Sequence, residues 1–310
     1  MKVNVEAVQP AAGIRKRSKW EKLWNEDGIP LLMILPPALL FLIFFYVPLF
    51  LGFWYSLTDW NGVDLQYNFI AFDNYIKAFT DERFWNTLGF TFQYALIVSV
   101  LINVIGLLLA LLLNQEIKCR NMFRGIFFFP AVLSLLTIGY IFNNLYYLFV
   151  PKIGHALGIE FLKTNILGNE QLAMWGIVFV NVWQGIAITI VIYLAGLQAV
   201  PKSIYESAKI DGVNAWQNLT RITLPLIIPA VTVNSILTLK GGLMVFDYII
   251  AMTNGGPGKA TEAIALFIYN KGFGSFKLGY GSAVSIILFL LFAVIAIIQI
   301  SYLRKREVEH

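Results

Sequence analysis

The sequence predicts an all-α membrane protein with six transmembrane helices and both termini in the cytoplasm. Of its 310 residues, 58% are hydrophobic and only 13% are charged, whereas soluble domains carry about 25% charged residues. The mean hydropathy is +0.70. Long uncharged stretches recur along the chain, and the basic residues concentrate on one side of them. Together these observations exclude an ordinary soluble domain.

The uncharged stretches define the expected spans, because a helix needs about 20 apolar residues to cross the hydrocarbon core. Five longer stretches lie between Asp27 and Asp59, Arg83 and Glu116, Arg124 and Lys152, Glu170 and Lys202, and Lys277 and Arg304. A sixth apolar stretch, 222–252, is interrupted by Lys240 and Asp247. We therefore predict a transmembrane domain over residues 29–303, between cytoplasmic segments 1–28 and 304–310.

The basic residues predict the orientation. With the N-terminus in the cytoplasm, the inner segments hold Lys2, Arg15, Lys16, Arg17, Lys19, Lys22, Lys118, Arg120, Arg124, Lys202, Lys209, Arg221, Arg304, Lys305 and Arg306. The outer segments hold only Lys77, Arg83, Lys152, Lys163, Lys259, Lys271 and Lys277. This bias follows the positive-inside rule, so residues 201–225 should lie in the cytoplasm.

The N-terminal region leaves one alternative open. Segment 14–24 interleaves basic residues with Trp20, Leu23 and Trp24. It forms either a helix on the inner membrane surface or only a positive flank that fixes the orientation. In the first span, the adjacent Pro36 and Pro37 predict a kink that neighbouring groups must accommodate.

The fifth span carries the unusual ionisable residues Lys240 and Asp247. In one helix, their spacing of two turns would place them on the same face, about 10 Å apart along the axis. Charged groups at this depth normally face the bundle interior, a partner charge or a water-filled path. Alternatively, Lys240 extends along the helix or pairs with another helix for structural reasons.

The polar stretch 201–225 predicts two short helices joined by a tight turn. Ser203 and Glu206 have the spacing of a capping box, and Asn214 and Gln217 repeat that signal. Gly212 suits the end of the first helix, because glycine readily adopts the left-handed conformation found there. A stiff projection of this kind between two spans indicates contact with a partner.

No motif for covalent catalysis or metal binding is present. The chain has one cysteine and two histidines, and neither HExxH nor a nucleophile elbow occurs. The GGPGKAT run at 255–261 does not fit the phosphate-loop pattern. We therefore expect no catalytic residue, metal or cofactor in this chain, and the net charge of +5 is too small to indicate binding of nucleic acid.

The run YESAKIDGVNAWQNLTRITLP at 205–225 resembles the cytoplasmic EAA loop of permease subunits from binding-protein-dependent ABC importers. The matching residues are Glu206, Ala208, Asp211, Gly212, Ile222, Leu224 and Pro225. Ser207 and Val213 replace small residues of the family pattern. In that family the loop couples the permease to its ATPase, which implies coupling roles for Ile204, Tyr205, Glu206, Ser207, Ala208, Asp211 and Gly212.

Segments 246–247, 252–273 and 278–285 resemble sugar-importer permeases of the maltose-permease and glycerol-phosphate-permease type. This resemblance implies a type I ABC importer bundle in the bacterial cytoplasmic (inner) membrane. The implied partners are a second homologous permease, a dimeric ABC ATPase that binds ATP-Mg, an extracytoplasmic solute-binding protein, a sugar and membrane lipid. ATP hydrolysis would then belong to a partner and not to this chain.

The same resemblance implies a sugar path midway through the membrane. The expected path residues are Ser134, Asn181, Gln184, Gly185, Lys240, Gly241, Gly242 and Val245. The Gly241–Gly242 pair would allow either sugar or a neighbouring helix to approach closely. A cation at Lys240 would favour an acidic or phosphorylated sugar.

Two other functions are compatible with parts of the sequence. A stand-alone secondary sugar transporter would also need polar, glycine-interrupted helices at mid-membrane, but the chain shows no internal repeat and no proton-relay acid. A structural or adaptor protein would leave Asn181, Lys240 and Asp247 unexplained. The ABC importer permease accounts for most of the chain.

Overall fold

A computed structural model describes residues 29–115 and 118–304, so the predicted 14–24 helix lies outside the described residues. The chain divides into two units at Trp54 and Tyr55, and each is described by itself. The described residues are helical apart from loops and one isolated β-bridge, Thr58 with Phe69. The expected all-α class is confirmed.

The first unit contains one apolar span. Helix α2, Ile29–Phe41, contains Pro36 and Pro37, and continues as π-helix η2, Leu42–Tyr46, into α3, Val47–Ser56. A π-helical stretch is a common local response to an interrupted hydrogen-bond pattern. Leu32–Ser56 qualifies as a span, yet none of its most apolar window is buried in the structure. A helix that is apolar all round requires lipid or another protein around it.

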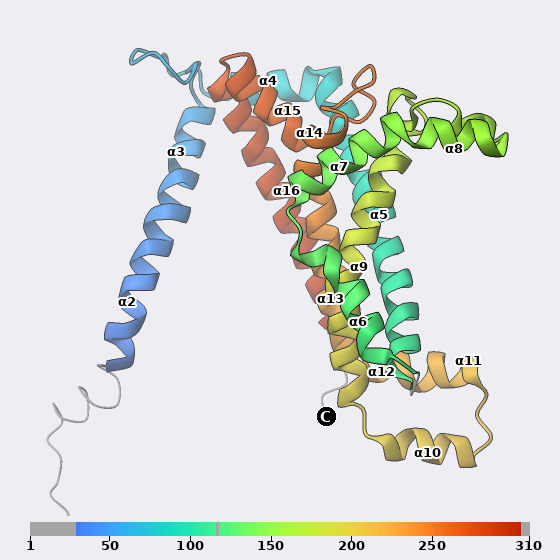
Figure 1. Cartoon of the computed structure of the whole chain (residues 1–310). Helices are drawn as coiled ribbons and strands as arrows, with labels where there is room; N and C mark the ends of the chain where they lie inside the picture. The colour runs from blue at the N-terminus through green and yellow to red at the C-terminus, as the bar shows by residue number, and fades with distance from the viewer. Residues whose placement is uncertain (1–28, 116–117, 305–310) are drawn as a thin grey trace, which may run out of the picture. The chain divides into compact units, whose positions relative to one another are not determined.

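The second unit is built around three packed helices. These are α5, Glu82–Asn114; α9, Ala173–Ala199; and α13, Ile228–Leu243 (Figure 1). A Cβ atom on Gly106 of α5 would lie 2.5 Å from Cγ2 of Thr189 on α9. Small residues at such contacts let membrane helices approach closely, where dispersion forces and hydrogen bonds hold them together.

Two further spans are bent pairs of helices. The first joins α6, Arg120–Phe128, and η3, Phe129–Val132, to α7, Leu135–Leu148, and α8, Val150–Leu157, with a bend of 98°. Pro130 lies in η3, shortly before this break, and cannot donate a backbone hydrogen bond.

The second bent pair joins α11, Ala215–Gln217, η6, Asn218–Thr223, and α12, Leu224–Leu226, to α13, with a bend of 76°. Pro225 and Pro229 stand at the starts of α12 and α13. With the four unbroken spans, the described residues provide six spans if each bent pair counts as one, which agrees with the prediction.

The loops and short helices of the second unit gather at its two ends. One end holds α4, Asp73–Thr80; α15, Ile264–Tyr269; η7, Asn270–Gly274; and the start of α16, Leu278–Arg304. The same end holds the short helices α8, η4 (Glu160–Leu162) and η5 (Ile166–Gly168) (Figure 1). The other end holds α10 (Lys202–Ile210) together with α11 and α12. This separation matches the predicted extracytoplasmic and cytoplasmic sides.

A partly buried ion pair links the start of α5 to the loop before α15. Arg83 at the start of α5 donates from Nε to Oε2 of Glu262 at 2.7 Å. Its Nη2 contacts Oε1 of the same carboxylate at 2.5 Å. Glu262 is only 2% exposed, so this two-pronged contact supplies the charge partner that a buried carboxylate requires.

The predicted continuous fifth helix is wrong beyond Leu243. Helix α13 ends there, and α14, Asp247–Met252, begins after a three-residue break. Met244 N donates to Lys240 O, and Val245 N donates to Gly242 O, which closes the helix. Gly241 and Gly242 stand just before this break, and glycine weakens a helix interior. Because of the break, Lys240 and Asp247 belong to different helices and do not share a face.

Candidate functional site

A cavity of about 430 Å³ opens among α5, α9, α13 and the two breaks at residues 131–135 and 244–248. Six of the eight expected path residues line it: Asn181, Gln184, Gly185, Gly241, Gly242 and Val245. The tertiary structure therefore brings together residues from the fourth and fifth spans.

Two expected path residues lie elsewhere. Ser134 is the exposed N-cap of α7 and does not line the cavity, although Leu133 and Leu135 on either side of it do. Lys240 lines a separate, mainly apolar groove between α13 and α16, together with Gln299. The cavity therefore gives no support to a selective role of Lys240 toward anionic sugars.

The side-chain amide of Asn181 uses its nitrogen within the chain and leaves its oxygen available. Its Nδ2 donates to the hydroxyl of the buried Tyr94 on α5 at 2.8 Å. Within the described part of the chain, no hydrogen bond engages Oδ1. The side chain lines the cavity, so this carbonyl oxygen can accept a hydrogen bond from a ligand hydroxyl.

Gln184 is saturated by contacts within the chain. Its Nε2 donates to Pro130 O at 3.1 Å and to Leu133 O at 3.0 Å. Its Oε1 accepts a hydrogen bond from Tyr248 OH. Because both amide protons and the carbonyl are used, Gln184 connects the break in the third span to α9 and α14, and has little capacity left for a ligand.

The two adjacent glycines have different surroundings. A Cβ atom on Gly242 would lie 2.7 Å from Cα of Ala95 on α5, which requires a backbone shift. A Cβ atom on Gly241 would meet nothing within 4 Å, although Gly241 also lines the cavity. Gly242 therefore serves helix packing, and Gly241 keeps space open.

Several polar cavity residues were not among the predicted path residues: Thr189, Asn234, Thr238, Asp247 and Tyr248. Thr238 Oγ1 accepts from Asn103 Nδ2 and contacts Ser99 Oγ, both at 2.8 Å. Thr189 lies on α9, Asn234 and Thr238 lie on α13, and Asp247 and Tyr248 lie on α14, so the sequence does not show them as one cluster. Asp247 alone carried a usable signal, because a charge within a span is unusual.

Segment 201–225, which we predict to be cytoplasmic, forms α10, a turn and α11, as expected from its capping and turn signals. Gly212 in the turn has φ +73°, a conformation that glycine adopts without strain. The second capping box is confirmed, since Gln217 N donates to Asn214 Oδ1 at 2.8 Å and Asn214 N donates to Gln217 Oε1 at 3.1 Å.

The first capping box is wrong, because α10 begins at Lys202 with Pro201 as its N-cap. Ser203 is thus already inside the helix, and no side chain caps this end. The predicted coupling residues also divide between two faces. Ala208 is buried, and Ile204 and Tyr205 pack against the chain's own core.

The exposed face of this segment carries Glu206, Ser207, Asp211 and Gly212. It also carries two large apolar side chains that the prediction missed: Ile210 is 86% exposed and Trp216 is 72% exposed. Ile210 follows Glu206 by four residues, which places both on one helix face. That spacing was the available signal.

The described residues thus combine apolar spans, a cavity between them with several polar side chains, and a projecting pair of short helices. Residues 102–308 match the family described as "Binding-protein-dependent transport system inner membrane component", and the chain belongs to this family. It is thus a multi-pass protein of the cytoplasmic (inner) membrane in a family of transport components.

Two similar proteins cover nearly the whole chain. The "Multiple sugar-binding transport system permease protein MsmF" of Streptococcus mutans serotype c is 40% identical over 275 residues, which is 89% of this chain and 95% of that protein. The "Probable starch degradation products transport system permease protein AmyD" of Thermoanaerobacterium thermosulfurigenes is 38% identical and covers 90% of this chain and 94% of that protein.

A solved structure shares the fold. A chain of a "bacterial alginate ABC transporter in complex with alginate pentasaccharide-bound periplasmic protein" aligns with a TM-score of 0.75 and 25% sequence identity. The alignment covers 91% of this chain and 96% of that chain. The architecture therefore extends over nearly the full length of both chains.

Proposed function

We propose that this chain is the transmembrane permease subunit of an ATP-driven carbohydrate importer, with oligosaccharides as the substrate class. The observation that carries the proposal is the mid-span cavity, where Asn181 presents a free amide oxygen and Gly241 leaves open space. Neutral amides and hydroxyls are suited to sugar hydroxyl groups. The sugar-related names of MsmF and AmyD support this class.

The proposed energy source is ATP hydrolysis in a dimeric ABC ATPase, which would also bind ATP-Mg. Within the described residues, no group of three His, Cys, Asp or Glu side chains could hold a metal ion. The exposed face of α10 and α11 would dock on that ATPase. Exposed aromatic and large apolar side chains such as Trp216 and Ile210 are typical anchors of protein interfaces.

Two more partners complete the proposed importer. A second homologous permease would close the other side of the path, because the cavity is open in this chain alone. An extracytoplasmic solute-binding protein would deliver the sugar, as the family description implies. Movements of the ATPase dimer would then expose the cavity to each side of the membrane in turn.

Reconstitution of the purified complex in proteoliposomes tests this function. We expect uptake of labelled oligosaccharide to require ATP on the ATPase side and binding protein on the opposite side. Uptake by this polypeptide alone, without ATP, would instead identify a secondary transporter. A preparation of the chain without any stoichiometric ATPase partner would contradict the proposal as well.

A further inference from the structure

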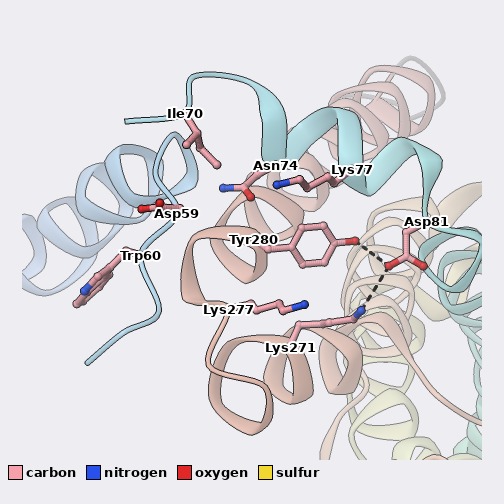
Figure 2. Close-up of a pocket in the computed structure, with 9 residues that line it drawn as sticks. All are labelled: Asp59, Trp60, Ile70, Asn74, Lys77, Asp81, Lys271, Lys277 and Tyr280. Carbon is pink, nitrogen blue, oxygen red and sulfur yellow. Dashed lines mark hydrogen bonds and ion pairs between the residues drawn. The ribbon is translucent and has the colours of Figure 1, made fainter. Parts of the chain in front are cut away.

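A second pocket lies at the extracytoplasmic end of the bundle, away from the mid-span cavity. It has a volume of about 330 Å³, and three lysines and two aspartates are among its lining residues (Figure 2). Its walls come from the loop after α3, from α4, from the residue that caps α5, and from η7 and α16. The transport cycle proposed above does not use it.

Hydrogen bonds fix one wall of this outer pocket. The buried Asn74 on α4 donates from Nδ2 to Ser56 O at 3.0 Å and to Thr58 O at 2.8 Å. The indole Nε1 of Trp60 donates to Asp64 O at 2.7 Å. The loop that carries Asp59 and Trp60 is therefore held against α4.

Asp81 forms the opposite wall and is fully engaged within the chain. It accepts from Arg83 N at 2.9 Å, from Tyr280 OH at 3.0 Å and from Lys271 Nζ at 3.5 Å. Burial opposes its ionisation, but the Tyr280 hydrogen bond and the Lys271 charge outweigh that effect and lower its pKa. Asp81 is thus charged at neutral pH and is balanced by Lys271.

The second carboxylate, Asp59, is also engaged. Asn68 donates to it from the backbone N at 2.6 Å and from Nδ2 at 3.0 Å. These hydrogen bonds lower the pKa of Asp59. Neither carboxylate of the pocket is therefore left without hydrogen-bond donors.

Lys77 and Lys277 remain as cations without a hydrogen-bonded partner, although the charge of Lys77 also helps to lower the pKa of Asp59. Both are exposed, and across the described chain neither ammonium group has a hydrogen bond or an ion pair. In Figure 2, Lys77 lies on one side of the Tyr280 ring, and Lys277 lies beside Lys271 on the other. The outer pocket thus has an excess positive charge and two unused donors.

Exposed apolar side chains lie near these cations in the sequence. Phe72 and Ile76, on the N-cap and first turn of α4, are 65% and 61% exposed, and Phe276 beside Lys277 is 60% exposed. Exposed aromatic side chains are enriched at protein interfaces. Patches that bind lipid usually collect four to eight basic residues. This pocket has only three lysines and also two ionised carboxylates, so a protein partner fits it better than a lipid surface.

We propose that the outer pocket receives an aspartate or glutamate side chain of the extracytoplasmic binding protein. Lys77 and Lys277 donate to its carboxylate, and the exposed apolar residues pack around it. This inference rests on the proposed function, because it assigns a contact to that function's delivery partner. The contact steers docking of the binding protein and plays no part in recognising sugar in the cavity.

The test uses the complete transporter in proteoliposomes of neutral phosphatidylcholine, titrated with sugar-loaded binding protein. The readout is the binding-protein concentration that gives half-maximal ATPase stimulation. For the Lys77→Glu/Lys277→Glu variant we expect this concentration to rise about tenfold with an unchanged maximal rate, since interface charges act mainly on association. The wild-type value should also rise with salt, and more steeply than the variant value.

Matched variants separate this contact from a general charge effect. For Lys77→Arg/Lys277→Arg, the half-maximal binding-protein concentration should stay close to the wild-type value. The second control, Lys152→Glu/Lys259→Glu, makes the same charge change at two other exposed lysines of the outer side and should also leave this concentration unchanged. An equal rise in the second control overturns the proposal. So does an effect of Lys77→Glu/Lys277→Glu that appears only when phosphatidylglycerol is added, which would identify a lipid site.

A charge exchange identifies the occupant. Each exposed acid of the binding protein is changed to lysine in turn. One of these changes should return the concentration for half-maximal stimulation of the Lys77→Glu/Lys277→Glu transporter to near the wild-type value. If none restores it, the occupant is not an acidic side chain and the proposal fails. Absence of any ATPase stimulation in the wild-type transporter would contradict the proposed function itself.

Discussion

Two amides three residues apart on α9 have different surroundings, and this difference matters at the residue scale. Asn181 has one free carbonyl oxygen that lines the cavity, whereas Gln184 is bonded to two backbone carbonyls and to Tyr248. Gln184 is only 6% exposed. We infer that Asn181 contacts substrate and that Gln184 holds the broken third span in place.

Replacement of the two amides should separate these roles. Gln184→Leu leaves buried polar groups without partners at about 1–3 kcal/mol each, so we expect a lower melting temperature and a lower maximal uptake rate. Asn181→Ala removes one ligand hydrogen bond worth about 0.5–1.5 kcal/mol, so the half-saturating sugar concentration should rise about two- to tenfold. Uptake kinetics and thermal unfolding measure both effects.

The opposite pattern would reverse the assignment. If Gln184→Leu raised the half-saturating sugar concentration and left the melting temperature unchanged, Gln184 would be a ligand contact. Val182→Ala, at a buried apolar position of the same helix, serves as a control that should lower stability without a selective change in sugar affinity.

At the scale of elements, the end of α13 combines packing and access. Gly242→Ala pushes a methyl group against the Ala95 backbone, because the added Cβ would lie only 2.7 Å from Ala95 Cα. Such overpacking costs about 1–3 kcal/mol, so we expect a lower melting temperature. Gly241→Ala has no steric conflict and should keep stability while it changes sugar affinity. Equal destabilisation by both variants would contradict this division.

The exposed face of α10 and α11 leads to a second prediction at this scale. Ile210→Asp and Trp216→Ala should weaken binding of the ATPase, because truncating an interface anchor costs about 2 kcal/mol or more. We expect co-purified ATPase to decrease at least several-fold while the permease still inserts. Ala208 is buried and therefore offers no such contact. The matched control is Lys202→Ala at an exposed position near the start of α10, which should leave the amount of co-purified ATPase unchanged.

Full ATPase recovery with both Ile210→Asp and Trp216→Ala would show that this face is not the docking surface. Gly212→Pro tests the turn itself, because proline cannot adopt the positive φ found there. For this variant we expect ATP hydrolysis to continue with little uptake, which separates coupling from docking.

At the scale of the whole molecule, the charge bias and the positions of the loops define a single orientation. Cys119, the only cysteine of the sequence, is exposed near the predicted inner side. A membrane-impermeant maleimide should therefore label it in inside-out vesicles and not in right-side-out vesicles. Cys119→Ser/Ser275→Cys should give the opposite result, because Ser275 is exposed at the outer end. Labelling of both proteins from one side would contradict the orientation.

The sequence alone determined the class, the six spans and the two short helices of segment 201–225. Membrane insertion depends on local composition, since each span must satisfy its own backbone hydrogen bonds and match the hydrocarbon thickness. Capping and turn signals are equally local, which explains why Gly212 and the Asn214–Gln217 box were predicted correctly. The failed box at Ser203 shows that a pattern does not fix the first residue of a helix.

Only the tertiary structure decided how side chains from separate spans are used. It placed Asn181, Gly241 and Asp247 around one cavity and Lys240 in another groove. It also showed that Gln184 is saturated by the break at Pro130 and Leu133, a partner more than 50 residues away that no local pattern contains. Membrane preference and turn conformation follow from neighbouring residues, whereas burial and hydrogen-bond partners depend on contacts between distant segments.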